Sequence, residues 1–436
     1  MNQTIRSRIE QIKRGEIPEG YEKTPFGIFP CDWEKDKSFK ELFSFFGGLG
    51  KSREELGTNG VCYLHYGDMH TGNFTKVSYA QYCDKPKYEI KISGEESFLM
   101  NDGDVAFLDA SEDLEGTSRA VLIDNPENRP FIAGLHTILA KEKQKVLSKN
   151  YKQYISMPQY VRKQFQRLAV GFKVYGLNRE TFNKVKISFP KSKVEQEKIA
   201  EILQEQDRLI ELKEKLIEEK KKQKQYLVQQ LLTKKLRLPG ISEEWRNITL
   251  GECLQEVNLR TTENNQYEVL SVTREGIVRQ KEQFNFQRAS DNNIGYKVIK
   301  KNQVAFSVLN LWMGSVDILQ SPEIGMISPA YKVFDCISNI IIPDFAKYFL
   351  RSAEMVWLYN VNSEIGASIV RKNLDLDGLL QSNVTIPKIP EQRAIAEVLS
   401  KADDELDLLL KELEEQKRKK QSLMQLLLTG IVRVKA

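Results

Sequence analysis

An internal repeat constrains this chain more than any other feature. Residues 195–237 recur as residues 391–433, at a constant offset of 391 − 195 = 196 residues. The dipeptide Glu-Gln, the tripeptide Ile-Ala-Glu and the tripeptide Leu-Leu-Thr keep their register in both copies. A period of this length marks a duplicated unit. We therefore expect two similar halves, which suit a protein that reads two sites better than an enzyme with one pocket.

Both copies carry apolar residues at alternating steps of four and three, which is the pattern of a coiled-coil seam. The seam positions of the first copy are Ile199, Leu203, Ile210, Ile217, Leu227 and Leu231, and those of the second are Ile395, Leu399, Ala402, Leu406, Leu409, Leu413, Leu423 and Leu427. Polar residues interrupt both seams at matched places, Lys220 and Lys224 in one and Gln416 and Lys420 in the other.

A helix of about 38 residues is roughly 57 Å long and needs a partner of similar length to cover its apolar stripe. A folded module separates the two copies, so the chain can return and pair them in antiparallel sense. The polar seam residues would then help to fix the register. The alternative is that each helix pairs with a helix of another molecule.

Each helix follows a stretch of about 150 residues that is rich in short β-branched and aromatic runs and in turn residues, which is typical of an α+β domain. We predict two globular domains separated by two long helices that form an intramolecular antiparallel coiled coil, with a pseudo-two-fold internal repeat. The predicted parts are 1–190 (first domain), 191–238 (first helix), 239–387 (second domain) and 388–436 (second helix).

The two domains are similar at a few landmarks only. The segment Asn101–Phe107 parallels Lys301–Phe306 as a turn that leads into a buried strand, and Gly171 parallels Gly366. Divergent domains on closely matched helices suggest a common role for the helices and different targets for the domains.

Composition agrees with this organisation but does not identify a partner. Lys and Arg exceed Asp and Glu by 65 − 60 = 5, a mild excess that permits a polyanionic ligand. Five scattered cysteines, without a CxxC pair, favour reduced thiols and a cytoplasmic location. The amino-terminal segment has no apolar core, and no run approaches about 18 apolar residues, so we expect neither export nor a membrane span.

The chain resembles the specificity subunits of type I restriction-modification systems over nearly its whole length. The resemblance is carried by the helix entries Phe189-Pro190-Lys191 to Glu195-Gln196 and Ile386-Pro387-Lys388 to Glu391-Gln392, the exits Leu231-Leu232-Thr233 and Leu427-Leu428-Thr429, and the opening Gly27–Trp33 ahead of Gly47-Gly48. It implies that each domain is a target-recognition domain for one half of a split, asymmetric sequence in double-stranded DNA.

The resemblance also implies the partners. The helices would act as a spacer that docks type I methyltransferase (modification) subunits, and type I restriction/translocase subunits would join them. S-adenosylmethionine, ATP and magnesium are expected on those partner subunits, and no cofactor is expected on this chain. A spacer of about 57 Å spans at most roughly 17 base pairs at about 3.4 Å each, so the two domains could straddle one site.

DNA reading requires side chains that can reach base edges and phosphates, and we look for them in loops that follow core strands. The candidates in the first domain are His65, Tyr66, Thr71, Asn73, Thr117, Ser118, Arg119, Lys173 and Tyr175. Those in the second domain are Thr273, Arg274, Arg279, Asn310, Trp312, Ser315, Ser368, Arg371 and Lys372. The basic runs 220–224 and 417–420 are either a further DNA contact or, as we prefer, a solvated face that binds protein.

Catalytic motifs are incomplete. The sequence Gly47–Ser52 has Phe45 in place of the first glycine of a phosphate-binding loop. The Asn125-Pro126-Glu127 tripeptide lacks the aromatic residue that clamps a flipped base, and Glu89-Ile90-Lys91 lacks an acidic partner for a nuclease. The spacing of Cys62, His65, His70 and Cys83 matches no zinc module, so no metal is expected. We therefore predict a non-catalytic DNA-recognition subunit, with a bivalent protein-binding adaptor as the alternative.

Overall fold

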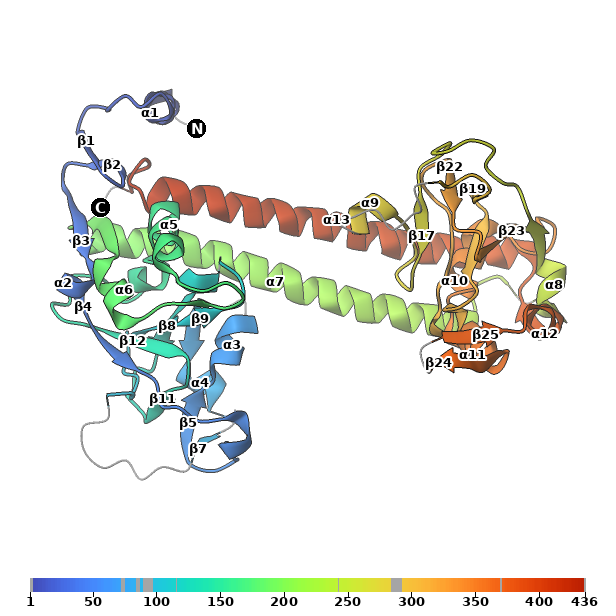
Figure 1. Ribbon diagram of the computed structural model, residues 1–436, viewed down its shortest axis with the longest axis horizontal. Coiled ribbons are helices and arrows are strands. Elements are labelled where there is room, and N and C mark those ends of the chain that lie inside the picture. Colours follow the sequence, from blue (N-terminus) through green and yellow to red (C-terminus); the bar gives the residue numbers. More distant parts are fainter. Residues whose placement is uncertain are drawn as a thin grey trace. The chain divides into compact units, whose positions relative to one another are not determined.

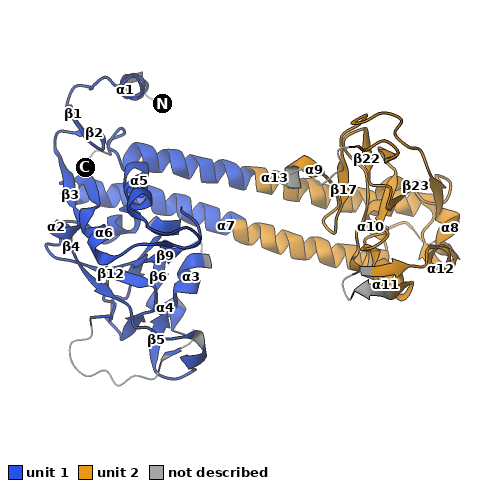
Figure 2. Ribbon diagram, in the orientation of Figure 1, with its two compact units in different colours: residues 1–213, 412–436 blue, residues 214–411 orange. Residues whose placement is uncertain are grey.

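The computed structural model describes residues 3–71, 75–83, 87, 88, 97–114, 116–241, 243–283, 292–368 and 371–434. The chain divides into two compact units, one formed by residues 1–213 and 412–436 and the other by residues 214–411 (Figure 2). Each unit thus contains a globular domain and a part of both long helices. The four-part division expected from the sequence stays an interpretation. No helix in the described ranges is long and apolar enough to cross a membrane.

The two repeats form two long helices, α7 (Lys193–Leu232) and α13 (Ile389–Leu427). Within each unit their segments lie side by side in antiparallel sense (Figure 1). In unit 1 the side chain of Gln206 donates to Gln416 Oε1 (2.9 Å), and in unit 2 Lys220 Nζ lies 2.6 Å from Glu405 Oε1. The predicted intramolecular antiparallel pair is therefore confirmed.

All of the predicted seam residues are shielded from solvent. Ile199, Leu203, Ile217, Leu231, Ile395, Leu399, Leu413 and Leu427 are buried, and Ile210, Leu227, Leu406, Leu409 and Leu423 are partly buried. Burying such side chains stabilises the pair by roughly 1.5–3 kcal/mol for each one that leaves water completely.

Charged pairs fix the register of the seam. Lys420 Nζ lies 2.5 Å from Asp207 in unit 1, and Lys224 pairs with Asp403 in unit 2. These are the same contact repeated, since 403 − 207 and 420 − 224 both equal 196. A tyrosine of each domain completes it, because Tyr154 donates to Asp207 (2.8 Å) and Tyr348 donates to Asp403 (2.6 Å).

Other seam contacts are not repeated, and they favour pairing of α7 with α13 over pairing of either helix with its own kind. Lys213 Nζ lies 2.6 Å from Glu412 in unit 1, and Lys220 pairs with Glu405 in unit 2. In a pair of two α7 helices, leucines would replace both glutamates, because Leu216 and Leu209 occupy the equivalent positions. The sequence pattern did not reveal this asymmetry.

A buried glutamine joins the start of each long helix to its own domain. Gln196 Nε2 donates to the carbonyls of Val146 and Pro190, and its Oε1 accepts from the Ser148 N–H. The second copy repeats all three bonds. Gln392 Nε2 donates to the carbonyls of Ile340 and Pro387, and its Oε1 accepts from the Ile342 N–H. Both side chains are fully buried. Because an unpaired buried amide is costly, these bonds orient each helix on its domain.

A glutamate at the start of each helix pairs with an arginine just beyond the end of the other. In unit 1, Arg433 Nε donates to Glu195 (2.6 Å), and its guanidinium also holds Asp32. In unit 2, Arg237 Nε lies 2.8 Å from Glu391, which also accepts from the Trp245 indole N–H. These bonds close each unit around both helix ends. The Arg433 side-chain hydrogen bond lowers the pKa of the Asp32 carboxyl.

Unit 1 is an α+β domain built on a five-stranded sheet of order β4-β12-β8-β10-β6. Its strands are β4 (Phe43–Gly47), β6 (Lys76–Ser78), β8 (Val105–Leu108), β10 (Ala120–Asp124) and β12 (Thr137–Glu142). A second sheet joins β11 (Phe131–Ala133), β5 (Val61–Leu64) and β7 (Lys87–Tyr88). The strand β8 is buried along its whole length, as the sequence predicts.

The remaining elements of unit 1 cover these sheets and join them to the helices. Two-stranded pairs are β1 (Tyr21–Thr24) with β2 (Gly27–Pro30), β3 (Trp33–Ser38) with β14 (Lys186–Pro190), and β9 (Ala110–Ser111) with β13 (Tyr175–Gly176). The helices are α1 (Gln3–Lys13), α2 (Phe39–Leu42), α3 (Tyr66–Thr71), α4 (Tyr79–Tyr82), α5 (Gln159–Leu168) and α6 (Arg179–Lys184), with 3₁₀ turns η1 (Arg53–Glu55), η2 (Gly116–Ser118) and η3 (Tyr151–Tyr154).

Unit 2 has a four-stranded sheet of order β16-β23-β20-β21 and four two-stranded pairs. The sheet strands are β16 (Leu254–Val257), β23 (Tyr331–Cys336), β20 (Val304–Ser307) and β21 (Val316–Ile318). The pairs are β15 (Arg246–Thr249) with β26 (Asn383–Ile386), β17 (Leu270–Val272) with β18 (Ile277–Arg279), β19 (Lys297–Lys300) with β22 (Ile324–Ile327), and β24 (Ser363–Ser368) with β25 (Arg371–Leu374). The helices are α8 (Leu250–Cys253), α9 (Gln280–Gln283), α10 (Pro343–Phe349), α11 (Ala353–Val361) and α12 (Leu376–Gln381), with the 3₁₀ turn η4 (Leu311–Met313).

The predicted turn before a buried strand occurs in both units, whereas Gly171 lies in a turn and its predicted counterpart Gly366 lies within β24. Gly103 and Asn302 both adopt positive φ in the turn before the buried strands β8 and β20. In each turn a backbone N–H donates to the side chain of the residue three positions later. The Asn101 N–H donates to Asp104, and the Lys300 N–H donates to Gln303. Burial raises the pKa of Asp104 to about 6. The two domains thus share a framework although their loops differ.

The contact between Lys224 and Asp403 gives a prediction about pH. Burial alone would raise the pKa of Asp403, but bonds from Lys224 and Tyr348 and the nearby charge of Lys347 lower it. A carboxylate with a lower pKa in the folded state stabilises the folded state above the unfolded-state pKa of about 3.9. This stabilisation is lost as the pH falls through the folded-state pKa. Asp403→Asn should therefore cost about 2 kcal/mol of unfolding free energy at pH 7. The difference from wild type should shrink below about pH 4 in denaturant titrations.

The exposed neighbour offers a matched control, because Asp404→Asn removes the same charge without the same contacts. A pH-independent deficit in Asp403→Asn would contradict the assigned ion pair.

Candidate nucleic-acid interface

In unit 1 the structure brings together candidates that lie far apart in sequence. The rings of His65 and Tyr66 have centroids 4.8 Å apart, and Tyr66 meets His136 edge-on at 5.3 Å. His136 Nδ1 lies 3.1 Å from an Asp109 carboxylate oxygen. Asp109 in turn precedes β9, which pairs with the strand β13 that carries Tyr175. A chain of contacts therefore links the rings on α3 to β13.

Arg119 links the same surface to the turn η2. Its guanidinium donates to the carbonyl oxygens of Met69 (3.2 Å) and His70 at the end of α3. A cation at a helix C-terminus satisfies carbonyl groups that have no partner within the helix. In this conformation the Arg119 side chain holds α3 in place, a role that sequence reasoning did not anticipate.

Thr117 is placed differently from the prediction. Its side chain is buried, and its hydroxyl donates to the Leu114 carbonyl at 2.7 Å. A side chain in this position stabilises its own turn and cannot reach a base edge, so we correct its assignment to a structural one. The side chains of Thr71 and Ser118 and the whole of Asn73 lie outside the described residues.

A tight turn at residues 170–176 presents Lys173 and Tyr175. Two backbone hydrogen bonds between Val170 and Gly176 close it, at 3.1 and 2.8 Å. The side chain of Lys173 is exposed, whereas Tyr175 is half-buried. Phe172, which the sequence analysis did not select, is the most exposed large apolar residue described, at 91%.

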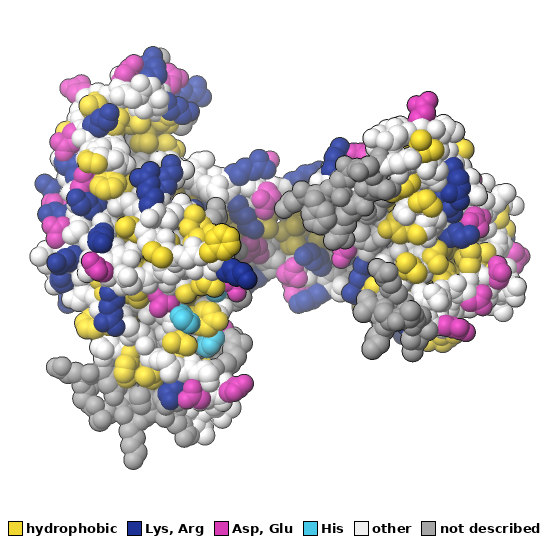
Figure 3. Space-filling model, in the orientation of Figure 1, with side chains coloured by type: hydrophobic (Ala, Val, Ile, Leu, Met, Phe, Trp, Pro, Cys, Tyr) yellow, Lys and Arg dark blue, Asp and Glu magenta, His cyan; other side chains and the backbone are white. Residues whose placement is uncertain are grey.

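Histidine side chains reach the surface of unit 1 among hydrophobic ones in the space-filling view, with lysine and arginine side chains nearby (Figure 3). This mixture of aromatic and cationic side chains is suited to stacking on bases and holding phosphates.

In unit 2 the candidates surround a depression of about 500 Å³. Its lining includes Thr273, Arg274, Asn310 and Ser315, from the β17–β18 turn and from the segment around η4. Ser315 is itself buried, which limits it to a contact with a group that enters the depression. The two sequence sets of the second domain thus meet at one place.

The turn that carries Arg274 is held by its neighbours. Thr273 closes it with a backbone bond to Gly276 (2.8 Å), and Arg351 donates to the carbonyls of Arg274 (3.1 Å) and Glu275 (3.0 Å). The carboxylate of Asp317 accepts the N–H of Ile277 on the far side. Burial raises the pKa of Asp317, and the charge of Arg351 opposes that rise. This support leaves the Arg274 side chain exposed at the rim.

The other basic candidates of unit 2 differ in their surroundings. Lys372 Nζ lies 5.0 Å from the centroid of the Trp312 ring, so two candidates from different segments form one cation–π pair. Arg279 Nε instead lies 2.9 Å from Glu268 in a partly exposed ion pair, which favours a structural role, and its DNA contact stays a prediction. The side chains of Ser368 and Arg371 lie outside the described residues.

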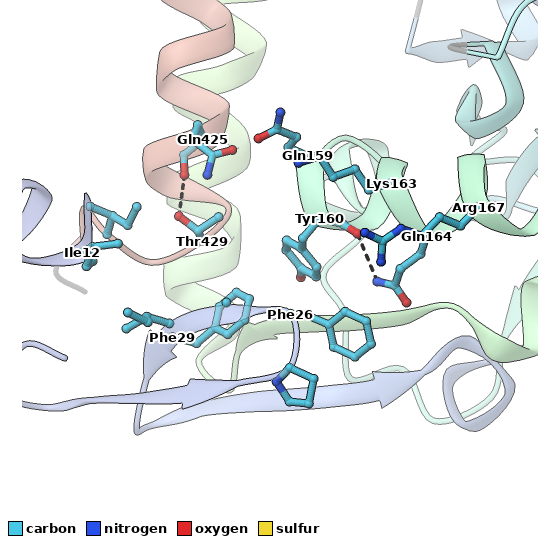
Figure 4. Close-up of a pocket in the computed structure, with 14 residues that line it drawn as sticks. Ile12, Phe26, Phe29, Gln159, Tyr160, Lys163, Gln164, Arg167, Gln425 and Thr429 are labelled. Carbon is cyan, nitrogen blue, oxygen red and sulfur yellow. Dashed lines mark hydrogen bonds between the residues drawn. The ribbon is translucent and has the colours of Figure 1, made fainter. Parts of the chain in front are cut away.

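A second concave site of about 330 Å³ in unit 1 was not anticipated (Figure 4). It lies between α5, the β1–β2 hairpin and the end of α13. Phe26 and Phe29 form an apolar floor, and the exposed Lys163 and Arg167 stand one turn apart on α5. Its cationic rim and apolar floor suit an amphipathic protein segment more than a base, because it has few groups that could discriminate base edges.

Comparison with known proteins agrees with this arrangement. Residues 30–222 match the family described as the type I restriction modification DNA specificity domain. A protein of Methanocaldococcus jannaschii, assigned as the MjaX specificity subunit of a type I restriction enzyme, is 23% identical over 437 residues. That alignment covers 96% of this chain and 97% of the relative.

Solved structures show the same fold. The S subunit of a type I restriction-modification system from M. genitalium superposes with a TM-score of 0.50 at 16% identity, covering 91% of this chain and 96% of that one. A chain from a structure on complex assembly and conformational transition of the type I R-M system gives a TM-score of 0.58 at 14% identity, covering 93% and 99%. The fold is that of a two-domain S subunit. Residues 30–222 thus match the type I restriction modification DNA specificity domain, and nearly the whole chain is similar to a specificity subunit.

The different surroundings of two arginines give a prediction. Arg274→Ala should weaken DNA binding about 5-fold or more, because an exposed guanidinium that contacts DNA contributes about 1–3 kcal/mol. It should leave the unfolding midpoint unchanged. Arg279→Ala should lower stability and leave DNA affinity nearly unchanged in the folded fraction. Fluorescence anisotropy and thermal unfolding of both variants test this, and equal effects of the two substitutions on DNA affinity would contradict it.

Proposed function

We propose that this chain is the non-catalytic specificity subunit that recognises a bipartite, asymmetric DNA site and directs methylation and restriction by partner subunits. Each unit would read one half-site. Methyltransferase subunits, with S-adenosylmethionine, and restriction/translocase subunits, with ATP and magnesium, would supply the chemistry.

One observation carries the proposal: two different polar and aromatic surfaces are mounted on two copies of one support. The supports share repeated contacts, which include the bonds of Gln196 and Gln392 and the pairs with Asp207 and Asp403. The surfaces do not repeat, since unit 1 offers rings on α3 and unit 2 offers a depression beside Arg274. Such divergence is expected if the two surfaces recognise different base sequences, because base-edge contacts determine specificity.

The helices supply the spacer in this proposal. A helix of 40 residues, the length of α7, is about 60 Å long, which sets an upper limit of roughly 18 base pairs on the span of the site. The seam contacts, together with the hydrogen bonds of Gln196 and Gln392 to their domains, would keep this length constant.

Exposed leucines on the helix faces outside the seam are suited to partner subunits. In unit 1 they include Leu209 and Leu212, and in unit 2 they include Leu408 and Leu410. Apolar side chains that a helix leaves in water favour packing against other helices. The basic runs 220–224 and 417–420 lie on the same helices, and Lys221 and Lys222 are already paired with Glu218 and Glu219. These pairs support the protein-binding interpretation over a DNA contact.

The adaptor alternative remains testable because the concave site of Figure 4 is suited to a protein segment. An adaptor without DNA specificity would bind its partners equally well on any DNA.

The decisive experiment is co-expression of this chain with its neighbouring methyltransferase in a host without DNA methylation, followed by mapping of methylated adenines by single-molecule sequencing. We expect one bipartite motif that disappears when this chain is omitted. Assembly of the complex without any chain-dependent methylation would overturn the proposal in favour of the adaptor.

Lengthening both helices tests the spacer. One heptad inserted after Lys213 in α7 and one before Glu412 in α13 would fall at the boundary between the compact units and preserve the seam period. Each insertion adds roughly 10 Å. The gap of unread base pairs between the two half-sites should therefore widen by about three base pairs. The half-site sequences should stay the same.

The control inserts the heptad in α7 alone, which breaks the register and should abolish methylation. An unchanged gap in the doubly extended variant would refute the spacer role.

A further inference from the structure

The turn at residues 170–176 displays apolar side chains that are largely exposed. Val170, Phe172 and Val174 are 78%, 91% and 52% exposed. They alternate along the chain, whereas large apolar residues elsewhere in unit 1 are mostly buried in its sheets and helices. Contiguous exposed apolar groups on a folded protein commonly mark an interaction site.

The turn is stiff. Val170 and Gly176 exchange backbone hydrogen bonds in both directions, and Tyr175 pairs with Ser111 of β9. Gly171 adopts φ +143°, and a Cβ there would lie 1.9 Å from the Val174 carbonyl oxygen. Only glycine fits this backbone, so Phe172 is held at the tip without the entropy cost of ordering a flexible loop on binding.

The surroundings of the turn are suited to DNA. Lys173 follows Phe172 directly and is exposed, as is Arg167 at the end of α5, the helix that leads into the turn. Asp113, which follows the paired strand β9, is exposed, and its carboxylate accepts the N–H of Gly116. Leu177 donates to the carbonyl of Asp109, which connects the turn to the ring cluster of His136, Tyr66 and His65.

We propose that Phe172 is an apolar wedge that inserts between neighbouring base pairs in or beside the half-site read by unit 1. This inference rests on the proposed function. DNA-binding proteins use Phe, Leu or Met in this way to unstack one step and bend the duplex, which brings more of the protein surface into contact. The flanking Lys173 would hold a phosphate next to the opened step.

Shape and charge favour DNA over a protein as the occupant. A single ring at a narrow tip matches the gap between two base pairs, whereas a helix-binding surface is broad and follows a helical repeat of apolar residues. A cation directly beside the ring is expected for a contact with a phosphate backbone.

The test uses the assembled complex with its methyltransferase and a duplex that carries the mapped recognition sequence. The fluorescent base 2-aminopurine, placed in turn at each position in and beside the first half-site, reports unstacking by an increase in emission. We expect the wild-type complex to raise emission at one step. Phe172→Ala should abolish this increase and weaken binding about 10-fold or more, within the range for loss of one base–aromatic stack.

Two further variants distinguish insertion of the Phe172 ring from the effect of a nearby charge and from a general loss of exposed apolar surface. Lys173→Ala should reduce the salt dependence of binding by about one phosphate contact, whereas Phe172→Ala should leave that dependence unchanged. Ile17→Ala removes an apolar side chain that is 52% exposed elsewhere in unit 1, and it should change neither signal.

The outcomes distinguish this inference from the proposed function. If the wild-type complex does not prefer its mapped site over random DNA, the proposed function itself fails. If it prefers the site and Phe172→Ala retains both affinity and the emission increase, the wedge is wrong. If Phe172→Ala instead prevents assembly with the methyltransferase, the turn is a protein contact and the wedge is equally refuted.

Discussion

The structure depends on the pairing of a lysine and an aspartate across the helix seam, which occurs once in each unit. Lys420 meets Asp207 in unit 1, and Lys224 meets Asp403 in unit 2. Leucine seams tolerate slippage by a heptad, but a partly buried charge does not tolerate the loss of its partner. Because a tyrosine of each globular domain also binds the aspartate, the same contact sets the register of the helices and the seating of each domain upon them.

The proposed function rests on how this support is combined with divergent surfaces. The side chains of Gln196 and Gln392 are buried and fully hydrogen-bonded, so substitutions on the proposed recognition surfaces need not disturb them. The Arg274 turn and the 170–176 turn are each stiffened by their own hydrogen bonds. A protein built in this way can change what it recognises while it keeps the geometry that a spacer requires.

Sequence patterns predicted the features that depend on periodicity. The heptad spacing gave both helices, the intramolecular partner and the seam residues, because burial of a helix stripe depends mainly on its period. Sequence landmarks also identified the turns at Gly103 and Asn302. The candidate DNA contacts were harder to select, since a loop threonine or arginine has the same appearance in sequence whether it faces solvent or its own backbone. Thr117 and Arg279 were selected on residue type, but Thr117 is buried and donates to the Leu114 carbonyl of its own turn, and Arg279 pairs with Glu268.

By itself, the sequence determined that the chain contains a duplicated unit, that its two helices carry matched apolar seams, and that two dissimilar domains accompany them. Only the tertiary structure decided which side chains share a surface. It placed His136 beside Tyr66, Lys372 over Trp312, and Phe172 at the tip of a closed turn. The physical reason is that helix periodicity is local and is written along the chain, whereas a recognition surface is assembled from residues brought together by strand pairing and packing.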